Sequence, residues 1–274
     1  MISSKANETI KNIRKLRNRK YREETGLAYV EGHKIIIDAL NARNAIEKII
    51  FSESFTQAEK NNPLLDRTRA KNYEIVYVTD EVFASISGKE NPKGIGVVIK
   101  QDWHIGLPHP LSGTWVGLYE VADTGNLGTI IRTLDAVGGN GIILIGNSTD
   151  PYDPGALRAS MGAIFSVKIV KTSLADFVDW AGKGHITIFG TSDQAEDSYM
   201  RQEYEDDMIL LMGSERQGLP QELIKICKHL ISLPMFGTAD SLNLSVATGV
   251  FLYDVLEKRM TRERLWMFSA IWCN

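Results

Sequence analysis

Short apolar runs alternate with amphipathic stretches along the whole chain, a pattern typical of an α/β protein. In the first part of the chain, apolar runs that predict strands lie at 27–30, 48–51, 74–78 and 96–99. Helical segments are expected near 33–40, 55–61, 64–71 and 80–86. Residues 1–20 precede these elements and predict one basic helix, with Ile10, Ile13 and Leu16 as its buried stripe. Together they predict a small α/β domain of about 100 residues.

The alternation resumes after residues 101–113, whose two prolines and two glycines predict a linker. Further strands are expected at 115–121, 141–145, 167–170, 186–189, 208–211 and 230–233. Helices are expected at 126–137, 153–163, 174–180 and 220–228, and a long apolar helix from Leu244 onward. Apolar strands separated by helices favour a parallel sheet. The predicted domains are therefore residues 1–104 and 113–262.

Composition changes this picture little. Apolar residues make up 43% of the chain and the net charge is −3, as in an ordinary globular protein without a global attraction for polyanions. Cys227 and Cys273 lack metal-like spacing, and His104 and His109 lack a partner cluster, so we interpret the histidines as linker residues. The chain does not open on a signal-peptide pattern, and no apolar run approaches the roughly 20 residues of a membrane span. We therefore expect a cytoplasmic protein.

A local excess of positive charge lies near the start of the chain. Seven basic residues and no acid occur from Lys11 to Arg22. Such a cluster attracts a phosphate backbone even when the whole protein is acidic. A solvated helical face explains the same pattern, and both interpretations stay open at this point.

Three polar or glycine-rich loops follow predicted strands, at 123–128, 213–218 and 233–243. Ligands gather at the carboxyl ends of strands in parallel α/β sheets, so these loops are predicted to build one site. Arg132 lies six residues beyond Asn126 in a mostly apolar helix, and its cation is expected near buried surface. There it needs a carboxylate, a phosphate or an interface. A salt bridge to Asp135 is the simple alternative for Arg132, and a helix N-cap is the simple alternative for Asn126.

The other two loops have ordinary explanations when each is taken alone. The segment GSERQG at 213–218 lacks the glycine spacing of a dinucleotide fingerprint and the Gly-Lys-Ser/Thr of a phosphate loop, so a strand-to-helix turn explains it. In the third loop, the backbone of Leu233–Met235 could face an adenine ring with Leu242 beside it. Ser241 or Asn243 could equally cap the next helix. No Ser/His/Asp set is evident, which argues against hydrolase chemistry.

Taken together, these motifs resemble a known family. The matching segments are 126–132 (NLGTIIR), 158–165 (RASMGAIF), 213–218 (GSERQG) and 233–247 (LPMFGTADSLNLSVA). Their order and spacing resemble the SpoU/TrmH branch of the SPOUT-class RNA ribose 2′-O-methyltransferases, densely over residues 115–259. The stretches VEGHKIIIDAL and NPKGIGVV look like the RNA-substrate-binding module of that family. Thr124 and Ser214 stand where the family often has Pro and Asn, and neither change removes a key group.

The resemblance implies a fold, a cofactor and a set of site residues. The implied fold is α/β, with a small N-terminal α/β RNA-binding domain and a C-terminal parallel-sheet domain tied in a deep trefoil knot (SPOUT). In that family the knot forms the pocket for S-adenosyl-L-methionine, whose contacts here would be Gly213, Leu233, Met235 and Leu242. The residues around the methyl transfer would be Asn126, Arg132, Glu215, Ser241 and Asn243. The candidate RNA-binding residues are Arg14, Lys15, Arg17, Arg19, Lys20, Arg22 and Arg158.

The implied enzyme is a homodimer that requires no metal, with the helix 244–256 at the contact between its two copies. A guanidinium stays protonated in proteins. We therefore expect Arg132 to grip the phosphate beside the target ribose rather than to act as a base, and Glu215 to hold Arg132 or the loop. Large-subunit ribosomal RNA (23S) is favoured over transfer RNA as the substrate. Two alternatives remain: a non-catalytic RNA- or ribosome-binding protein of the same fold, and a nucleotide-binding enzyme acting on small molecules.

Overall fold

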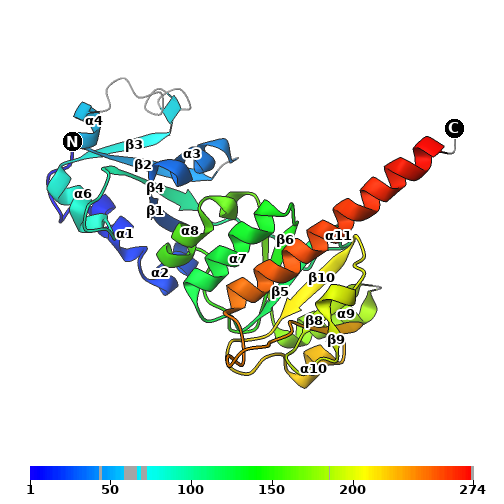
Figure 1. Ribbon diagram of the computed structural model, residues 1–274. Coiled ribbons are helices and arrows are strands. Elements are labelled where there is room, and N and C mark those ends of the chain that lie inside the picture. Colours follow the sequence, from blue (N-terminus) through cyan, green and yellow to red (C-terminus); the bar gives the residue numbers. More distant parts are fainter. Residues whose placement is uncertain (43–44, 59–66, 69–72, 185, 273–274) are drawn as a thin grey trace. The chain divides into compact units, whose positions relative to one another are not determined.

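The computed structural model describes residues 1–42, 45–58, 67–68, 73–184 and 186–272 (Figure 1). Their contacts divide the chain into two compact units. The first unit contains Met1–Asp102 and Asp150–Ser166, and the second contains Trp103–Thr149 and the chain from Val167 onward. Each unit is described by itself below. The helix expected at 64–71 falls mostly outside the described residues.

The first unit is built on a four-stranded mixed sheet. Its strands are β1 (Leu27–Glu31), β2 (Ile46–Ser52), β3 (Glu74–Val78) and β4 (Ile95–Lys100), in the order β1-β4-β2-β3. β4 runs antiparallel to β1 and β2, and β2 runs parallel to β3. The helices from the N-terminal segment are α1 (Glu8–Lys15), α2 (Arg19–Thr25), α3 (His33–Asn41), α4 (Glu53–Ala58) and α6 (Asp80–Ile86). The strands and helices expected there thus form a small α/β unit.

The basic N-terminal segment forms two helices, so the single helix expected over residues 1–20 is wrong. Asn7 caps α1 through Thr9 N, and Asn18 caps α2 through Tyr21 N. An asparagine at such a position ends one helix and starts another because its side chain competes for backbone N–H groups. The predicted inward stripe is confirmed, since Ile10, Ile13 and Leu16 are all buried.

A segment from far along the sequence completes the first unit. Helix α8 (Pro154–Ser160) begins after Asp153, whose carboxylate accepts a hydrogen bond from Gly155 N, as the Asp-Pro pair predicts. The helix ends earlier than expected because Met161 and Gly162 take positive φ angles of 51° and 95°. A short 3-10 turn, η1 (Ala163–Phe165), follows.

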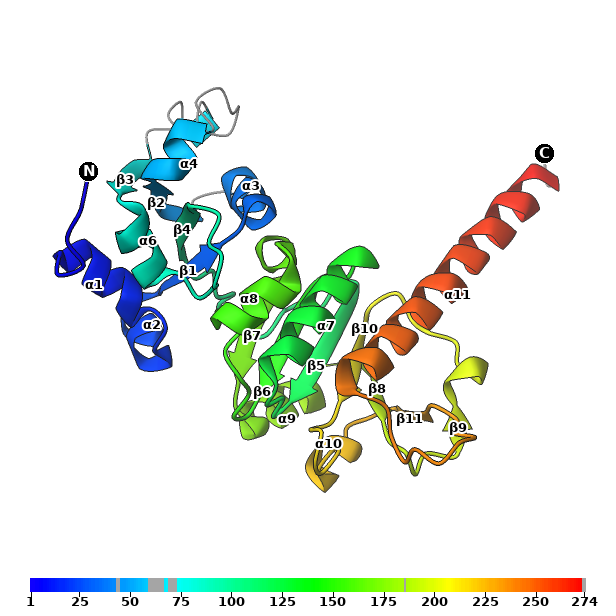
Figure 2. The ribbon, with the colours of Figure 1, turned by 60° about the vertical axis from the view of Figure 1, so that its left-hand side comes forward.

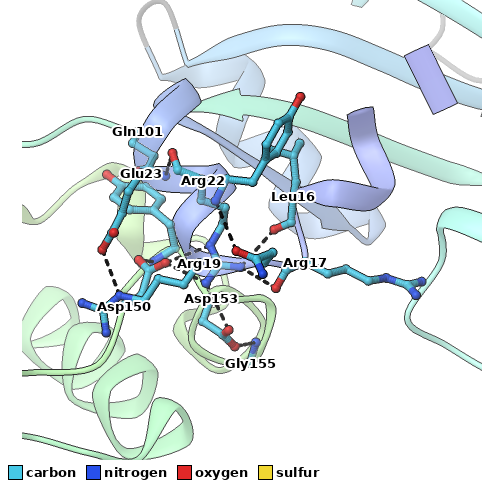
Figure 3. A network of polar contacts seen from close by, with 12 residues as sticks. Leu16, Arg17, Arg19, Arg22, Glu23, Gln101, Asp150, Asp153 and Gly155 are labelled. Carbon is cyan, nitrogen blue, oxygen red and sulfur yellow. Dashed lines mark hydrogen bonds and ion pairs between the residues drawn. The ribbon is translucent and has the colours of Figure 1, made fainter. Parts of the chain in front are cut away.

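Arg22 ties α2 to this inserted segment (Figure 3). Its side chain is 2% exposed, and its guanidinium lies 2.7 Å from the carboxylate of Asp150 and 3.3 Å from that of Asp153. Nη1 also donates to the backbone carbonyls of Leu16 and Arg17, both at 2.9 Å. The expectation that Arg22 contacts RNA is corrected here, because this guanidinium is buried and already hydrogen-bonded on all its nitrogens.

Replacing Arg22 by Ala is expected to destabilise the first unit by about 3–5 kcal/mol, because the largely buried carboxylate of Asp150 loses its counter-charge. Chemical denaturation measures the change. Lys20→Ala is the matched control on the same helix, since Lys20 is 84% exposed and 3.9 Å from Glu24. The control should change stability by less than about 0.5 kcal/mol. Equal effects of the two substitutions would contradict a structural role for Arg22.

The second unit is built on a seven-stranded sheet in which every neighbouring pair is parallel, so the predicted parallel sheet is confirmed. The strand order is β7-β6-β5-β10-β8-β11-β9. The strands are β5 (Thr114–Tyr119), β6 (Gly141–Ile145), β7 (Lys168–Thr172), β8 (Thr187–Thr191), β9 (Asp197–Ser198), β10 (Met208–Met212) and β11 (His229–Ser232). The short edge strand β9 was not expected from the sequence.

The helices of the second unit are α7 (Thr124–Ala136), α9 (Leu174–Lys183), α10 (Gln221–Ile224) and α11 (Leu244–Trp272), with a 3-10 turn η2 (Tyr199–Arg201). Asp123 caps α7 through Asn126 N, so the alternative that Asn126 is itself the cap is wrong. α11 packs against α7, and both views show its C-terminal half projecting away from the sheet (Figures 1 and 2). Within the described part of the chain, no helix combines the length and apolar character that crossing a bilayer requires.

Candidate active site

Two loops far apart in sequence leave the parallel sheet side by side. β5 and β10 are neighbours in register, with Leu118 opposite Met212, and both strands end at the same edge. After β5 the chain continues to β6, which lies on the side of β5 away from β10. After β10 it continues to β11, which lies on the opposite side of the sheet, beyond β8. Such a switch point leaves a crevice at the carboxyl ends of the strands. The loop at 120–123 and the loop at 213–219 flank it.

An open depression lies at this edge of the sheet. It is lined by Glu120, Ala122, Asp123, Asn126, Ser214, Glu215, Arg216, Gln217 and Asn243. Glu215 bridges the two loops, because its carboxylate accepts from Asn126 Nδ2 at 3.2 Å and from Ala122 N at 3.4 Å. The structure therefore brings Asn126, Glu215 and Asn243 together. Two roles are expected for Glu215, and in this structure its carboxylate has the second, because it holds the loop at 120–123.

The segment GSERQG closes on itself as a tight turn. Ser214 N donates to Gly218 O at 3.1 Å, and Gly218 N donates to Ser214 O at 3.0 Å. A Cβ on Gly213 would lie 2.3 Å from the carbonyl carbon of Gly218, so only glycine fits there. Gly218 has a φ of 67°. The glycines of this motif thus shape the turn that holds Glu215 in place.

Asn243 lines the depression and also starts α11. Its Oδ1 accepts hydrogen bonds from Ser245 N at 2.9 Å and from Ser245 Oγ at 2.7 Å. The expected alternative of a helix-capping asparagine is therefore confirmed. Its Nδ2 makes no hydrogen bond within the described part of the chain, so the cap leaves one amide donor available.

The loop that follows β11 lies further along the same edge. β8 separates β11 from β10, so Gly213 and Leu233 follow strand ends about 10 Å apart. The side chains of Met235 and Leu242 are 38% and 42% exposed, and Ser241 is also exposed. None of these four loop residues, nor Gly213, lines the depression around Glu215.

Arg132 is not where its sequence context predicted. It is exposed on α7, and neither Asp135 nor any other acid in the described residues forms a salt bridge with it. The expectation of a cation near buried surface is therefore wrong for this chain taken alone, because the apolar residues of α7 face the other way. The guanidinium remains open to a ligand or a second chain.

Some lining residues escaped the sequence reasoning. Asp123 could have been recognised, because an aspartate three residues before the N–H it accepts is an ordinary N-cap signal. Glu120 gave no signal. It follows β5 with a φ of 48°, a left-handed conformation that side chains with a Cβ rarely adopt. Strain of this kind at a strand end is frequent beside functional sites.

Comparison with known proteins agrees with this architecture. The sequence model of the SpoU rRNA Methylase family matches residues 113–253, and that of an MRM3-like substrate binding domain matches residues 7–96. The chain belongs to the SpoU rRNA methylase family. Its relatives include an uncharacterised tRNA/rRNA methyltransferase of Synechocystis, 30% identical over 92% of both chains. A 23S rRNA (guanosine(2553)-2′-O)-methyltransferase of Bacillus subtilis is 25% identical over 92% of this chain and 97% of the relative.

Solved structures carry the same fold over nearly the whole chain. The AdoMet-bound rRNA methyltransferase from Sinorhizobium meliloti matches with a TM-score of 0.83 and 34% identity, covering 93% of this chain and 96% of that one. The SpoU methyltransferase AviRb from Streptomyces viridochromogenes, in complex with AdoMet, matches with a TM-score of 0.83 and 25% identity over 93% and 98%. These matches confirm the fold class that the resemblance implied, a knotted SPOUT domain after a small α/β domain.

Glu120→Gly is expected to stabilise the protein by about 0.5–1 kcal/mol, because glycine takes a positive φ without the steric cost of a Cβ. The measurement is thermal or chemical unfolding. Glu120→Ala is the matched control, since it removes the carboxylate and keeps the Cβ, and it should bring no gain. A glycine variant no more stable than the alanine variant would show that this backbone stores no strain.

Proposed function

We propose that this chain transfers a methyl group from S-adenosyl-L-methionine to a ribose 2′-hydroxyl of 23S ribosomal RNA, in the cytoplasm where ribosomes are made. The observation that carries the proposal is the depression in which Asn126, Glu215 and Asn243 meet, within the segment that matches the SpoU family. Relatives of similar length are named as 23S rRNA 2′-O-methyltransferases, which supports ribosomal RNA as the substrate.

The residues beside the depression fit the cofactor. The loop after β11 exposes the apolar side chains of Met235 and Leu242, which suit an adenine ring, and Gly213 presents backbone without a side chain. Leu233, Met235, Leu242 and Gly213 would hold S-adenosylmethionine. When bound, this cofactor supplies an electrophilic methyl group on a sulfonium.

The polar residues of the depression would orient the reacting groups. Glu215 accepts from Asn126 Nδ2, which fixes the orientation of that amide and leaves its Oδ1 as an acceptor. Asn243 Nδ2 offers a donor, and Ser241 adds a hydroxyl. A ribose carries hydroxyl groups that need both kinds of partner. Holding donor carbon and acceptor oxygen in line can itself lower the barrier by several kcal/mol.

Arg132 would contribute charge rather than proton transfer. Its guanidinium has no ion-pair partner in the described part of the chain. An exposed, unpaired arginine suits bidentate binding of a phosphate. We therefore assign it to the phosphate beside the target ribose, where it also stabilises negative charge that develops on the 2′-oxygen.

Arg132→Ala is expected to lower methyl transfer at least about 100-fold while S-adenosylmethionine binding is retained. Radiolabelled transfer to 23S ribosomal RNA and mapping of 2′-O-methyl positions measure the reaction, and calorimetry measures cofactor binding. Asp135→Ala, on the same helix, is the control and should stay active. Loss of cofactor binding in Arg132→Ala would give Arg132 a structural role. Wild-type protein that binds RNA but transfers no methyl group would support the non-catalytic alternative.

A second copy of the chain is the partner we propose for α11. Val246, Tyr253 and Met260 are 52%, 55% and 46% exposed, and their seven-residue spacing places them on one stripe. The half-buried Val250 and Leu256 fill the positions between them. An apolar stripe of this length on a projecting helix is unfavourable in water and typical of a helix–helix interface. The family resemblance supports a homodimer.

Tyr253→Glu is expected to shift the protein from dimer to monomer, because a carboxylate on each copy would be buried in the shared stripe. Light scattering coupled to size-exclusion chromatography measures the mass at several concentrations. Glu222→Lys, an exposed change on α10, is the control and should remain dimeric. A wild-type protein that stays monomeric at high concentration would contradict the proposed dimer.

A further inference from the structure

A small, partly enclosed recess lies in the first unit, apart from the depression that holds Glu215. It is formed where the end of α1, strand β1, the end of α6 and helix α8 meet. We name it the Tyr29 recess after its buried hydroxyl; its polar lining consists of Arg17, Tyr29, Glu31, Gly88, Lys89 and Arg158. Two of the arginines expected to bind RNA, from opposite halves of the sequence, thus share one recess.

Tyr29 lines this recess, and its hydroxyl has no partner in the described part of the chain. The side chain is 8% exposed, and its hydroxyl oxygen is buried with no hydrogen bond in the described part of the chain. The tyrosine ring lies over Gly96 of β4, where a Cβ would come within 2.2 Å of the hydroxyl oxygen. Glycine in a strand interior costs stability, and here it makes room for the tyrosine. Burial raises the pKa of Tyr29, so the group remains a neutral O–H donor.

A buried donor of this kind calls for an acceptor, since buried polar groups are nearly always hydrogen-bonded. The nearby carboxylate of Glu31 is bonded to other groups. Its Oε2 accepts from the Ser87 hydroxyl at 2.6 Å, and its Oε1 accepts from Gly88 N at 2.9 Å. Neither of these bonds involves Tyr29, so its hydroxyl is unpaired in the described part of the chain and can donate to a ligand that enters the recess.

The charges around the recess favour an anion. Arg17, Lys89 and Arg158 have no salt-bridge partner among the described residues, whereas Glu31 is the one carboxylate in the lining. Arg17 is held in place because Nη2 donates to the carbonyls of Ile86 and Ser87, at 3.1 and 2.6 Å. Lys89 and Arg158 are long side chains at the surface and can move to admit a ligand. Three cations against one carboxylate attract negatively charged oxygen.

We propose that the Tyr29 recess binds a backbone phosphate of the RNA substrate, with the Tyr29 hydroxyl donating to one phosphate oxygen and the three cations surrounding the charge. This inference rests on the proposed function, because it takes RNA as the ligand. The limited room of the recess suits a phosphate, and Tyr29, the one aromatic residue in its lining, is only 8% exposed and leaves no open ring face for a base to stack on. Phosphate contacts of this kind position an RNA without reading its sequence.

Tyr29→Phe tests the inference, because it removes one oxygen and keeps the packing. We expect affinity for a 23S ribosomal RNA fragment to fall about ten- to a hundredfold, the loss of one hydrogen bond to a charged group. The KM for RNA should rise by the same factor while kcat is unchanged. The salt dependence of binding should keep its slope, because a hydroxyl carries no charge. Arg158→Ala should instead lower that slope by about one unit.

Tyr77→Phe is the matched control, a half-buried tyrosine of the same unit outside the recess, and it should bind RNA as the wild type does. Unfolding midpoints of all variants are measured first; if Tyr29→Phe fails to fold, the slope change in Arg158→Ala decides. Unchanged RNA affinity in a folded Tyr29→Phe overturns the proposal.

A test with inorganic phosphate distinguishes an RNA phosphate from a free anion as the ligand of the Tyr29 recess. If phosphate raises the unfolding temperature of the wild type but not of Tyr29→Phe, while RNA affinity is equal in both, the recess serves a free anion and the proposal is overturned. Weaker RNA binding by Tyr29→Phe supports the phosphate-binding proposal even if the wild type transfers no methyl group. A wild type that transfers no methyl group would count against the proposed function and not against the role of the recess.

Discussion

The pairing of β5 with β10 is the constraint on which the candidate site depends. Glu215 and Ala122 are 93 residues apart in sequence, yet the parallel register of these two strands sets them within hydrogen-bonding distance. Parallel strands end at one edge, so every loop that follows them is brought to the same side of the sheet. The carboxylate of Glu215 then fixes the two loops to each other, and with them the amide of Asn126.

Basic residues in one short segment serve different purposes. Arg22 is buried against Asp150 and Asp153 and holds the inserted helix α8 in the first unit. Lys20 lies two positions before Arg22 on the same helix, and its side chain is 84% exposed. Arg17 differs from both, because its Nη2 donates to two backbone carbonyls and the residue lines the Tyr29 recess. A run of basic residues in the sequence therefore indicates only a region that can bind an anion. Burial in the folded chain decides which of its cations are available to a ligand.

The long helix α11 joins the site to the proposed partner. Asn243 caps its first turn beside the depression, and the stripe from Val246 to Met260 stays exposed on the single chain. A second copy that covers this stripe would rest on the same helix that orients Asn243. Dimerisation and the geometry of the site would thus depend on one element.

The sequence by itself determined the alternation of strands and helices, the parallel sheet, the three loops and the family, because apolar periodicity and local turn residues carry those signals. It also predicted the Asp153 cap and the buried stripe of α1. Only the tertiary structure decided that Arg22 is buried, that Arg132 is exposed and that Glu215 bonds to Asn126. It also showed that residues 150–166 belong with the first unit. These facts depend on contacts between segments distant in sequence, and no local pattern of residues encodes which side chains meet across such distances.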